Sequence, residues 1–198
     1  MKSFFHKYNY SIIKMFVNQF AISLFGATLA LATTSSKNDA LTVTVSVCAV
    51  VFYLFLLYVM TWEIGAKDRI SVDTGKKAYK PMTGMWLSII ANVPNFIIAI
   101  LFTIGYPSMI SGGEWGSNLC GVMQILLFLL EGMYLGLLTV FRIPVGGTML
   151  QLNHIWWPYF LITIPAIFTC WLAYYLGHKN VRFTSIMVYK DPNQKKKK

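Results

Sequence analysis

One acidic residue stands inside an otherwise apolar segment of the chain. Glu131 directly follows the run GVMQILLFLL. A charged carboxylate at the centre of a bilayer costs about 3 kcal/mol or more, so this side chain must be protonated, paired or in contact with water. Ionisable groups at that depth commonly bind protons or ions, which makes Glu131 the first candidate for a functional residue. Gln124, seven residues earlier, lies within about 20° of the same helix face and is a second candidate.

A polar stripe precedes this residue in the chain. Ser88, Asn92, Asn95 and Ala99 follow the i, i+4, i+7, i+11 spacing of one helix face. Pro94 falls inside the stripe, and a proline kinks a helix because it removes one backbone hydrogen bond. We therefore expect a free carbonyl near Asn92, with Asn92 and Asn95 as neutral ligands for a cation or polar solute.

Small and polar residues also recur in two other apolar segments. In the first they occupy one helix face, at Gln19, Ser23, Gly26, Ala30 and Thr33. In the fourth, Gly132 and Gly136 form a GxxxG pattern that lets a neighbouring helix approach closely. Gln19 joins the candidate ligands, and Gly26, Gly132 and Gly136 are predicted helix contacts. Packing alone is an alternative explanation for all these stripes, because carboxamides also hydrogen-bond between membrane helices.

Signatures of soluble enzymes and metal sites are missing from the sequence. It contains no GxxxxGK[ST] phosphate loop, no GxSxG elbow, no HExxH and no acidic pair at metal-ligand spacing. Cys48, Cys120 and Cys170 form no CxxC and lie in or beside apolar segments. We expect no enzyme activity, no metal and no cofactor, although an intramembrane enzyme is not excluded.

The amino-acid composition indicates the class of fold that positions these residues. Of 198 residues, 56% are hydrophobic and 12% are charged, against roughly 45–50% and 25% in soluble domains. A bilayer core needs about 20 apolar residues per helix. Five stretches qualify, near residues 12–33, 41–62, 84–105, 119–141 and 156–177. The predicted fold class is all-α: a polytopic membrane protein with five clear transmembrane helices and room for a sixth short or re-entrant segment.

The distribution of basic residues favours an even number of crossings. Fifteen of the 17 Lys and Arg residues lie before or in the opening turns of the first apolar stretch, in the loop 63–83 or after Gly177. The positive-inside rule places all three regions in the cytoplasm, with the loop 106–118 opposite. Five simple crossings would put the two termini on opposite sides of the membrane and so cannot place all three regions in the cytoplasm. We expect the parity to change after Arg142, in the segment 143–155 with its proline and glycines, or else by two shorter crossings within residues 113–152.

The expected organisation is one transmembrane domain, residues 1–177, with a basic cytoplasmic tail, residues 178–198. The expected location is the plasma or inner membrane, with both termini cytoplasmic. An alternative for the first segment is a signal peptide ending at Ala30-Leu31-Ala32. The basic residues that give the net charge of +10 flank hydrophobic spans. We therefore expect the lipid bilayer as a partner, together with a membrane or cytoplasmic subunit, and we expect no nucleic acid.

Two functions are consistent with these patterns. The first is a small transporter or substrate-binding membrane subunit. Its cavity would be built from the first, third and fourth spans, closed by the loop 106–118, with Glu131 binding a proton, cation or cationic solute. The second is an accessory or scaffold protein whose basic loop and tail hold a cytoplasmic partner or anionic lipid.

Overall fold

Helices make up most of the structure. The computed structural model describes residues 2–36, 38–76, 78–145 and 147–181. The longer helices are α1 (Lys2–Thr34), α2 (Asp39–Asp73), α4 (Val93–Ile110), α5 (Glu114–Glu131) and α8 (Ile164–His178). Shorter elements complete the chain: α3 (Thr83–Ala91), η1 (Gly132–Tyr134), α6 (Leu135–Val140), η2 (Leu152–His154), α7 (Pro158–Leu161) and the strands β1 (Arg142–Val145) and β2 (Thr148–Gln151).

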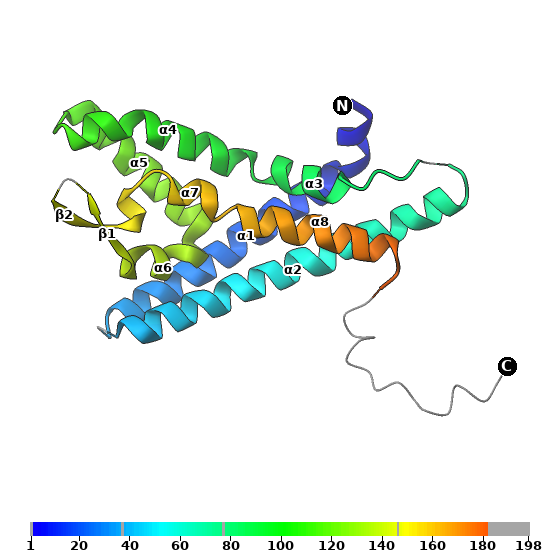
Figure 1. Ribbon diagram of the computed structural model, residues 1–198, viewed down its shortest axis with the longest axis horizontal. Coiled ribbons are helices and arrows are strands. Elements are labelled where there is room, and N and C mark those ends of the chain that lie inside the picture. The colour runs from blue at the N-terminus through cyan, green and yellow to red at the C-terminus, as the bar shows by residue number, and fades with distance from the viewer. Residues whose placement is uncertain (1, 37, 77, 146, 182–198) are drawn as a thin grey trace.

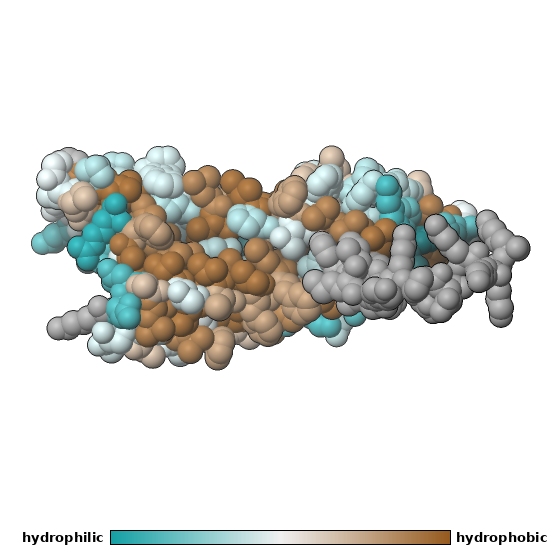
Figure 2. All heavy atoms as spheres, turned by 60° about the horizontal axis from the view of Figure 1, so that its bottom comes forward, coloured by the Kyte–Doolittle hydropathy of each residue, from teal (hydrophilic) through white to brown (hydrophobic). Residues whose placement is uncertain are grey.

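Five helical segments are long and apolar enough to cross a membrane, as predicted. They are Phe4–Thr34, Asp39–Asp73, Val93–Ile110, Glu114–Val140 and Pro158–His178. Large apolar side chains point outward along them, among them Phe55, Ile104 and Ile125. Figure 2 shows apolar residues over the middle of the bundle and hydrophilic ones toward its two ends. Helices suit this environment because each satisfies its own backbone hydrogen bonds.

The bundle has two distinct ends (Figure 1). The start of α1, the loop of residues 74–82 and the end of α8 lie at one end, which we call the terminal end. The turn between α1 and α2, the turn between α4 and α5, and the two strands lie at the other, which we call the hairpin end. The helices α1 and α2, and the broken pairs α3–α4 and α7–α8, each run from one end to the other.

The fourth apolar segment does not run end to end. It enters from the hairpin end as α5, breaks into a single 3₁₀ turn at Gly132–Tyr134 and returns as α6 (Figure 1). Thr139 and Arg142, beyond the turn, line a small hollow together with Thr34 and Asn38 of the α1–α2 connection. This reversal lies within residues 113–152, the range of the alternative with two shorter crossings, and not after Arg142, where a short or re-entrant element was first expected.

The segment after Arg142 forms a small antiparallel hairpin at the hairpin end. Arg142 pairs with Gln151 and Val145 with Thr148. Gly147 has a φ of +85°, a conformation that favours glycine at the turn. This hairpin is the only sheet among the described residues, and it lies at the end of the bundle and not among its helices.

The helices also extend further than hydropathy alone predicts. Helix α2 continues through Glu63 to Asp73, so the first half of the expected loop 63–83 is helical. Helix α4 ends at Ile110 and α5 begins at Glu114, which reduces the expected loop 106–118 to residues 111–113. At the start of α2 the Asn38 side chain caps the helix by accepting a hydrogen bond from Leu41 N at 3.1 Å.

Candidate functional site

Glu131 is the last residue of α5, directly before the re-entrant turn. Its side chain faces the bundle interior, and the residue is only 3% exposed. The Gln19 amide Nε2, from the middle of α1, donates to Glu131 Oε1 at 3.1 Å. The Asn95 amide Nδ2, from α4, donates to the same oxygen. Glu131 is therefore paired, beside the polar stripe of the third span, and it joins three helices.

The polar stripe continues away from Glu131 as a line of hydrogen-bonded amides. Asn95 Nδ2 also donates to Asn92 Oδ1 at 3.0 Å, and Asn92 Nδ2 donates to the Ser88 carbonyl at 2.9 Å. Asn95 Oδ1 is buried and has no hydrogen-bond partner within the described part of the chain. Two oxygen acceptors, this amide oxygen and the Glu131 carboxylate, are thus contributed by neighbouring side chains.

The proline break occurs where it was expected, beside Asn92. Helix α3 ends at Ala91, and Pro94 lies in the first turn of α4. The Asn92 carbonyl itself accepts a hydrogen bond from Phe96 N at 3.0 Å. Among buried side-chain atoms near the break, Asn95 Oδ1 has no partner within the described residues.

Close contacts at glycines hold the re-entrant turn in place. Gly132 N donates to Ser23 Oγ at 2.5 Å. A Cβ added at Gly132 would lie 2.7 Å from the Ser23 carbonyl oxygen, and one added at Gly26 would lie 2.5 Å from Met133 Cα. At Gly136 it would lie 2.1 Å from Ser46 Oγ of α2. All three glycines named from the sequence lie where α1 or α2 meets this turn.

Gln124 lies on the Glu131 side of α5 but bonds elsewhere. Its Nε2 donates to the Asn153 carbonyl at 3.0 Å and lies 3.0 Å from His154 Nδ1. It therefore connects α5 to the segment after the hairpin, and its amide nitrogen bonds there and not to the Glu131 carboxylate. The structure brings Gln19, Asn92 and Asn95 together at Glu131, and places Gln124 two helical turns away.

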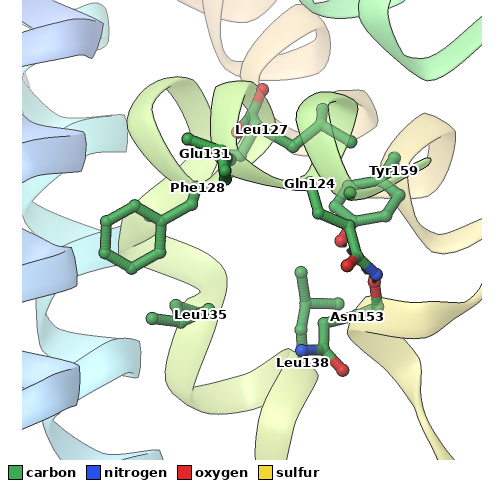
Figure 3. Close-up of a pocket in the computed structure, with 11 residues that line it drawn as sticks. Gln124, Leu127, Phe128, Glu131, Leu135, Leu138, Asn153 and Tyr159 are labelled. Carbon is green, nitrogen blue, oxygen red and sulfur yellow. Dashed lines mark hydrogen bonds between the residues drawn. The ribbon is translucent and has the colours of Figure 1, made fainter. Parts of the chain in front are cut away.

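A cavity of about 420 Å³ connects these two positions. Its wall consists of Gly121, Gln124, Ile125, Leu127, Phe128, Glu131, Gly132, Leu135, Leu138, Asn153 and Tyr159. Figure 3 shows Phe128 and Leu135 on one side, with Gln124 and Asn153 across from them. The walls come from α5, the turn, α6, η2 and α7. The expected cavity between the first, third and fourth spans, closed by the loop 106–118, is therefore not the one observed.

A second buried carboxylate was missed from the sequence. Asp68, assigned to the loop 63–83, lies on α2 and is 3% exposed. Lys7 Nζ contacts its Oδ1 at 2.7 Å, and the hydroxyls of Tyr8 and Tyr174 donate to its Oδ2. One signal pointed to it: Thr61, Gly65 and Asp68 continue the buried face of α2 at i, i+4, i+7 spacing.

Metal ligands do not cluster in the part of the chain that the structure describes. No group of three His, Cys, Asp or Glu residues there is placed to hold an ion. Cys120 and Cys170 are fully buried, and Cys48 faces outward.

Comparison with protein-family models, with curated proteins and with solved structures gives no match for this chain.

Proposed function

We propose that this multi-pass membrane protein is a small transporter or substrate-binding membrane subunit that binds a proton, a cation or the cationic group of a small solute at Glu131. The observation that carries the proposal is the position of Glu131. It is fixed by Gln19 and Asn95 at the point where two apolar segments are interrupted, and it forms part of a cavity wall.

The interruptions support this proposal physically. Broken helices at membrane depth are tolerated only where protein or a cavity surrounds them, and transporters commonly bind their ions and substrates at such breaks. Here the α3–α4 break at Asn92 and the turn after Glu131 are linked through Asn95. A third break, after Ile162 between α7 and α8, shares an apolar hollow with Tyr134 of the turn.

The balance of donors and acceptors favours a positively charged ligand. Both amide donors near Glu131 converge on one carboxylate oxygen, Oε1. The nearby Asn95 Oδ1 is a buried acceptor without a partner among the described residues, and such a group costs about 1–3 kcal/mol. A proton on Glu131, or a cation held between the two side chains, would satisfy these oxygens.

The proposed orientation places the terminal end in the cytoplasm. The start of α1, the end of α2, the loop 74–82 and the end of α8 lie at the terminal end. Among the described residues they carry Lys2, Lys7, Lys67, Arg69, Lys76 and Lys80, with Lys179 directly after α8, whereas Arg142 lies at the hairpin end. The tail, residues 182–198, lies outside the described residues, and its binding to a partner subunit or to anionic lipid remains part of the proposal.

One observation favours the accessory or scaffold alternative. The two carboxamides on Glu131 and the close glycine contacts beside it are also what tight helix packing requires. In that case Glu131 would hold α1, α4 and α5 together and bind nothing else.

Thermal unfolding of the purified protein separates the two functions. The probes are sodium, potassium, methylammonium and agmatine at matched ionic strength, together with a pH series. The variant is Glu131→Gln, which keeps the shape but cannot titrate, and the control is Glu114→Gln, at an exposed position on the same helix. We expect at least one probe at saturation to raise the Tm of wild type and of Glu114→Gln by about 5 °C, and to leave Glu131→Gln unchanged.

If Glu131 binds only a proton, the Tm values follow a different pattern. The Tm difference between wild type and Glu131→Gln then changes with pH, while Glu114→Gln follows wild type. A cation that passes the first test is assayed for uptake into proteoliposomes, where Glu131→Gln should abolish transport. If no probe and no pH change distinguishes Glu131→Gln from wild type, the scaffold function is correct and the binding function is wrong.

A further inference from the structure

A groove at the terminal end separates the start of α1 from the start of α3, which lie beside each other there (Figure 1). It has a volume of about 560 Å³ and is lined by Phe4, Phe5, Tyr79, Lys80, Pro81, Met82, Thr83, Trp86 and Ile90. We call it the terminal groove. Lys80 is the one charged residue in this lining, and Phe5, Met82 and Trp86 are each nearly half exposed. The terminal groove therefore combines a broad apolar surface with a single cation.

The terminal groove runs along a helix from the edge of the apolar layer. Met82, Trp86 and Ile90 are spaced four residues apart and so share one face at the start of α3. At a rise of 1.5 Å per residue, the three side chains cover about 12 Å of helix. On the facing helix, the apolar span of α1 begins at Phe4. The groove thus leads from the headgroup level into the hydrocarbon region, as the acyl chain of a phospholipid does.

Lys80 lies at the outer end of the terminal groove. Its carbonyl accepts hydrogen bonds from Thr83 N at 3.2 Å and from Thr83 Oγ1 at 2.8 Å, which fixes the backbone of Lys80 directly before α3. The side chain is exposed and forms no ion pair within the described part of the chain. A lysine at this depth lays its stem along apolar surface and keeps its ammonium at the level of the headgroups.

Tyr79 provides a second donor without an acceptor. Its ring stacks on that of His178 with 4.0 Å between centroids, which fixes its position. The Tyr79 hydroxyl is buried and has no hydrogen-bond partner among the residues that the structure describes. Leaving a buried hydroxyl unpaired costs free energy. Two neighbouring residues of the groove, Tyr79 and Lys80, therefore offer donors to an oxygen-rich, negatively charged group such as a phosphate ester.

We propose that the terminal groove binds one phospholipid with an anionic headgroup, its acyl chain along α3 and its phosphate at Lys80 and Tyr79. The site is separate from Glu131, and the proposal does not rest on the proposed function. Under the proposed orientation the site lies in the cytoplasmic leaflet, where anionic lipids attract basic side chains.

Charge favours a lipid over the tail of the chain as the occupant. Residues 182–198 follow the end of α8 and include apolar residues, but they also carry six basic residues and one acidic residue. Their net charge has the same sign as that of Lys80 and repels it. An anionic headgroup has the complementary charge.

A second apolar hollow of the bundle provides an internal comparison. It is lined by Met82, Met85, Ile164, Ile167, Phe168 and Trp171. This lining contains a tryptophan, as the terminal groove does, but no charged residue. We therefore expect acyl chains to contact Trp171 without preference for the headgroup, and to contact Trp86 with a preference for an anionic one.

Fluorescence quenching by brominated lipid measures both contacts. The full chain is reconstituted into bilayers of equal parts phosphatidylglycerol and phosphatidylcholine, with the acyl chains of only one of the two lipids brominated in each sample. The signal of each tryptophan is obtained by subtracting that of Trp86→Phe or Trp171→Phe. We expect phosphatidylglycerol to be enriched about fivefold over phosphatidylcholine at Trp86, the preference that one lysine near the surface provides. At Trp171 we expect nearly equal quenching by the two lipids.

Substitutions of lysine show whether the preference belongs to the groove. Lys80→Gln should abolish the enrichment at Trp86, and Lys80→Glu should reverse it. The matched control is Lys76→Gln, which removes an exposed lysine of the same loop that does not line the groove. We expect this control to keep the fivefold enrichment.

Three outcomes would overturn the proposal. Equal enrichment at Trp86 and Trp171 would mean that anionic lipid gathers around the whole bundle. An equal loss in Lys76→Gln and Lys80→Gln would assign the preference to the overall charge of the terminal end. Absence of quenching at Trp86 by either lipid would mean that the tail or a second copy of the chain covers the groove.

Discussion

Gln19 Nε2 lies 3.1 Å from Glu131 Oε1 and so connects the middle of α1 to the end of α5, 112 positions along the chain. The same Gln19 nitrogen lies 3.4 Å from the Leu130 carbonyl oxygen. The first helix is therefore fastened to the re-entrant turn by a buried side chain.

A double-mutant cycle measures this contact. We expect Gln19→Leu to lower the free energy of unfolding by about 1 kcal/mol, because it removes a donor from a buried carboxylate. In a Glu131→Leu background the same change should cost much less, since both polar partners are then replaced by apolar groups. Additive effects of the two substitutions would show that the hydrogen bond contributes nothing to stability.

The contact between Gly136 and α2 gives a larger expected effect. A Cβ at Gly136 would lie 2.1 Å from Ser46 Oγ and 2.9 Å from the Thr42 carbonyl oxygen. We expect Gly136→Ala to lower the free energy of unfolding by about 2 kcal/mol, because α6 must move away from α2.

Gly121→Ala is the matched control. Nothing lies within 4 Å of a Cβ added at Gly121, which lies in α5 of the same re-entrant segment. Alanine should therefore be neutral there or stabilise by about 0.5–1 kcal/mol through helix propensity. Equal losses at the two glycines would contradict the packing described for α6.

The hydroxyl of Tyr174 is expected to matter more than that of its neighbour Tyr175. Tyr174→Phe removes the 2.9 Å hydrogen bond to the buried Asp68 and should cost about 1 kcal/mol in unfolding free energy. Tyr175→Phe keeps the stacked contact with Trp171 and should change little. Denaturant unfolding of both variants beside wild type checks this, and a larger loss at Tyr175 would show that Asp68 does not depend on the hydroxyl.

Periodicity and proline made part of the site predictable. The spacing of Asn92 and Asn95 fixes which face of a helix they share, and Pro94 forces a break beside them. A mid-membrane carboxylate must also face protein or water, which directs Glu131 to the interior. These inferences depend on local geometry and on the cost of burying charge, and they hold in any bundle.

The re-entrant turn and the Asp68 cluster depend on tertiary contacts and were not predictable in the same way. The GxxxG of Gly132 and Gly136 indicates close packing, but it does not show that the helix reverses between them. Hydropathy falls at Glu63, whereas the α2 backbone remains helical to Asp73 because Gly65 and Asp68 pack against α8 and α1. The charge count favoured an even number of crossings, and the structure shows that the fourth apolar segment reverses between α5 and α6.

The reversal of the re-entrant segment predicts which positions of the chain share one side of the membrane. Single cysteines at Ser111, Met149, Thr74 and Lys179 are introduced after Cys48, the one outward-facing native cysteine, is changed to alanine. Because α5 returns through α6, an impermeant thiol reagent should label positions 111 and 149 from one side, and positions 74 and 179 from the other. Five simple crossings would instead separate 111 from 149 and place 149 with 74.

Two controls make this labelling decisive. The buried Cys120 and Cys170 should stay unlabelled in every sample, so a signal from the parent protein would indicate unfolding. Permeabilised membranes should label all four positions, which shows that each is reactive. Under the proposed orientation, intact cells label only positions 111 and 149, because the terminal end faces the cytoplasm. Labelling of positions 74 and 179 alone would mean that the orientation is reversed and that the re-entrant turn is correct. Labelling of position 111 without position 149 would contradict the re-entrant turn, because only a full crossing separates these two positions.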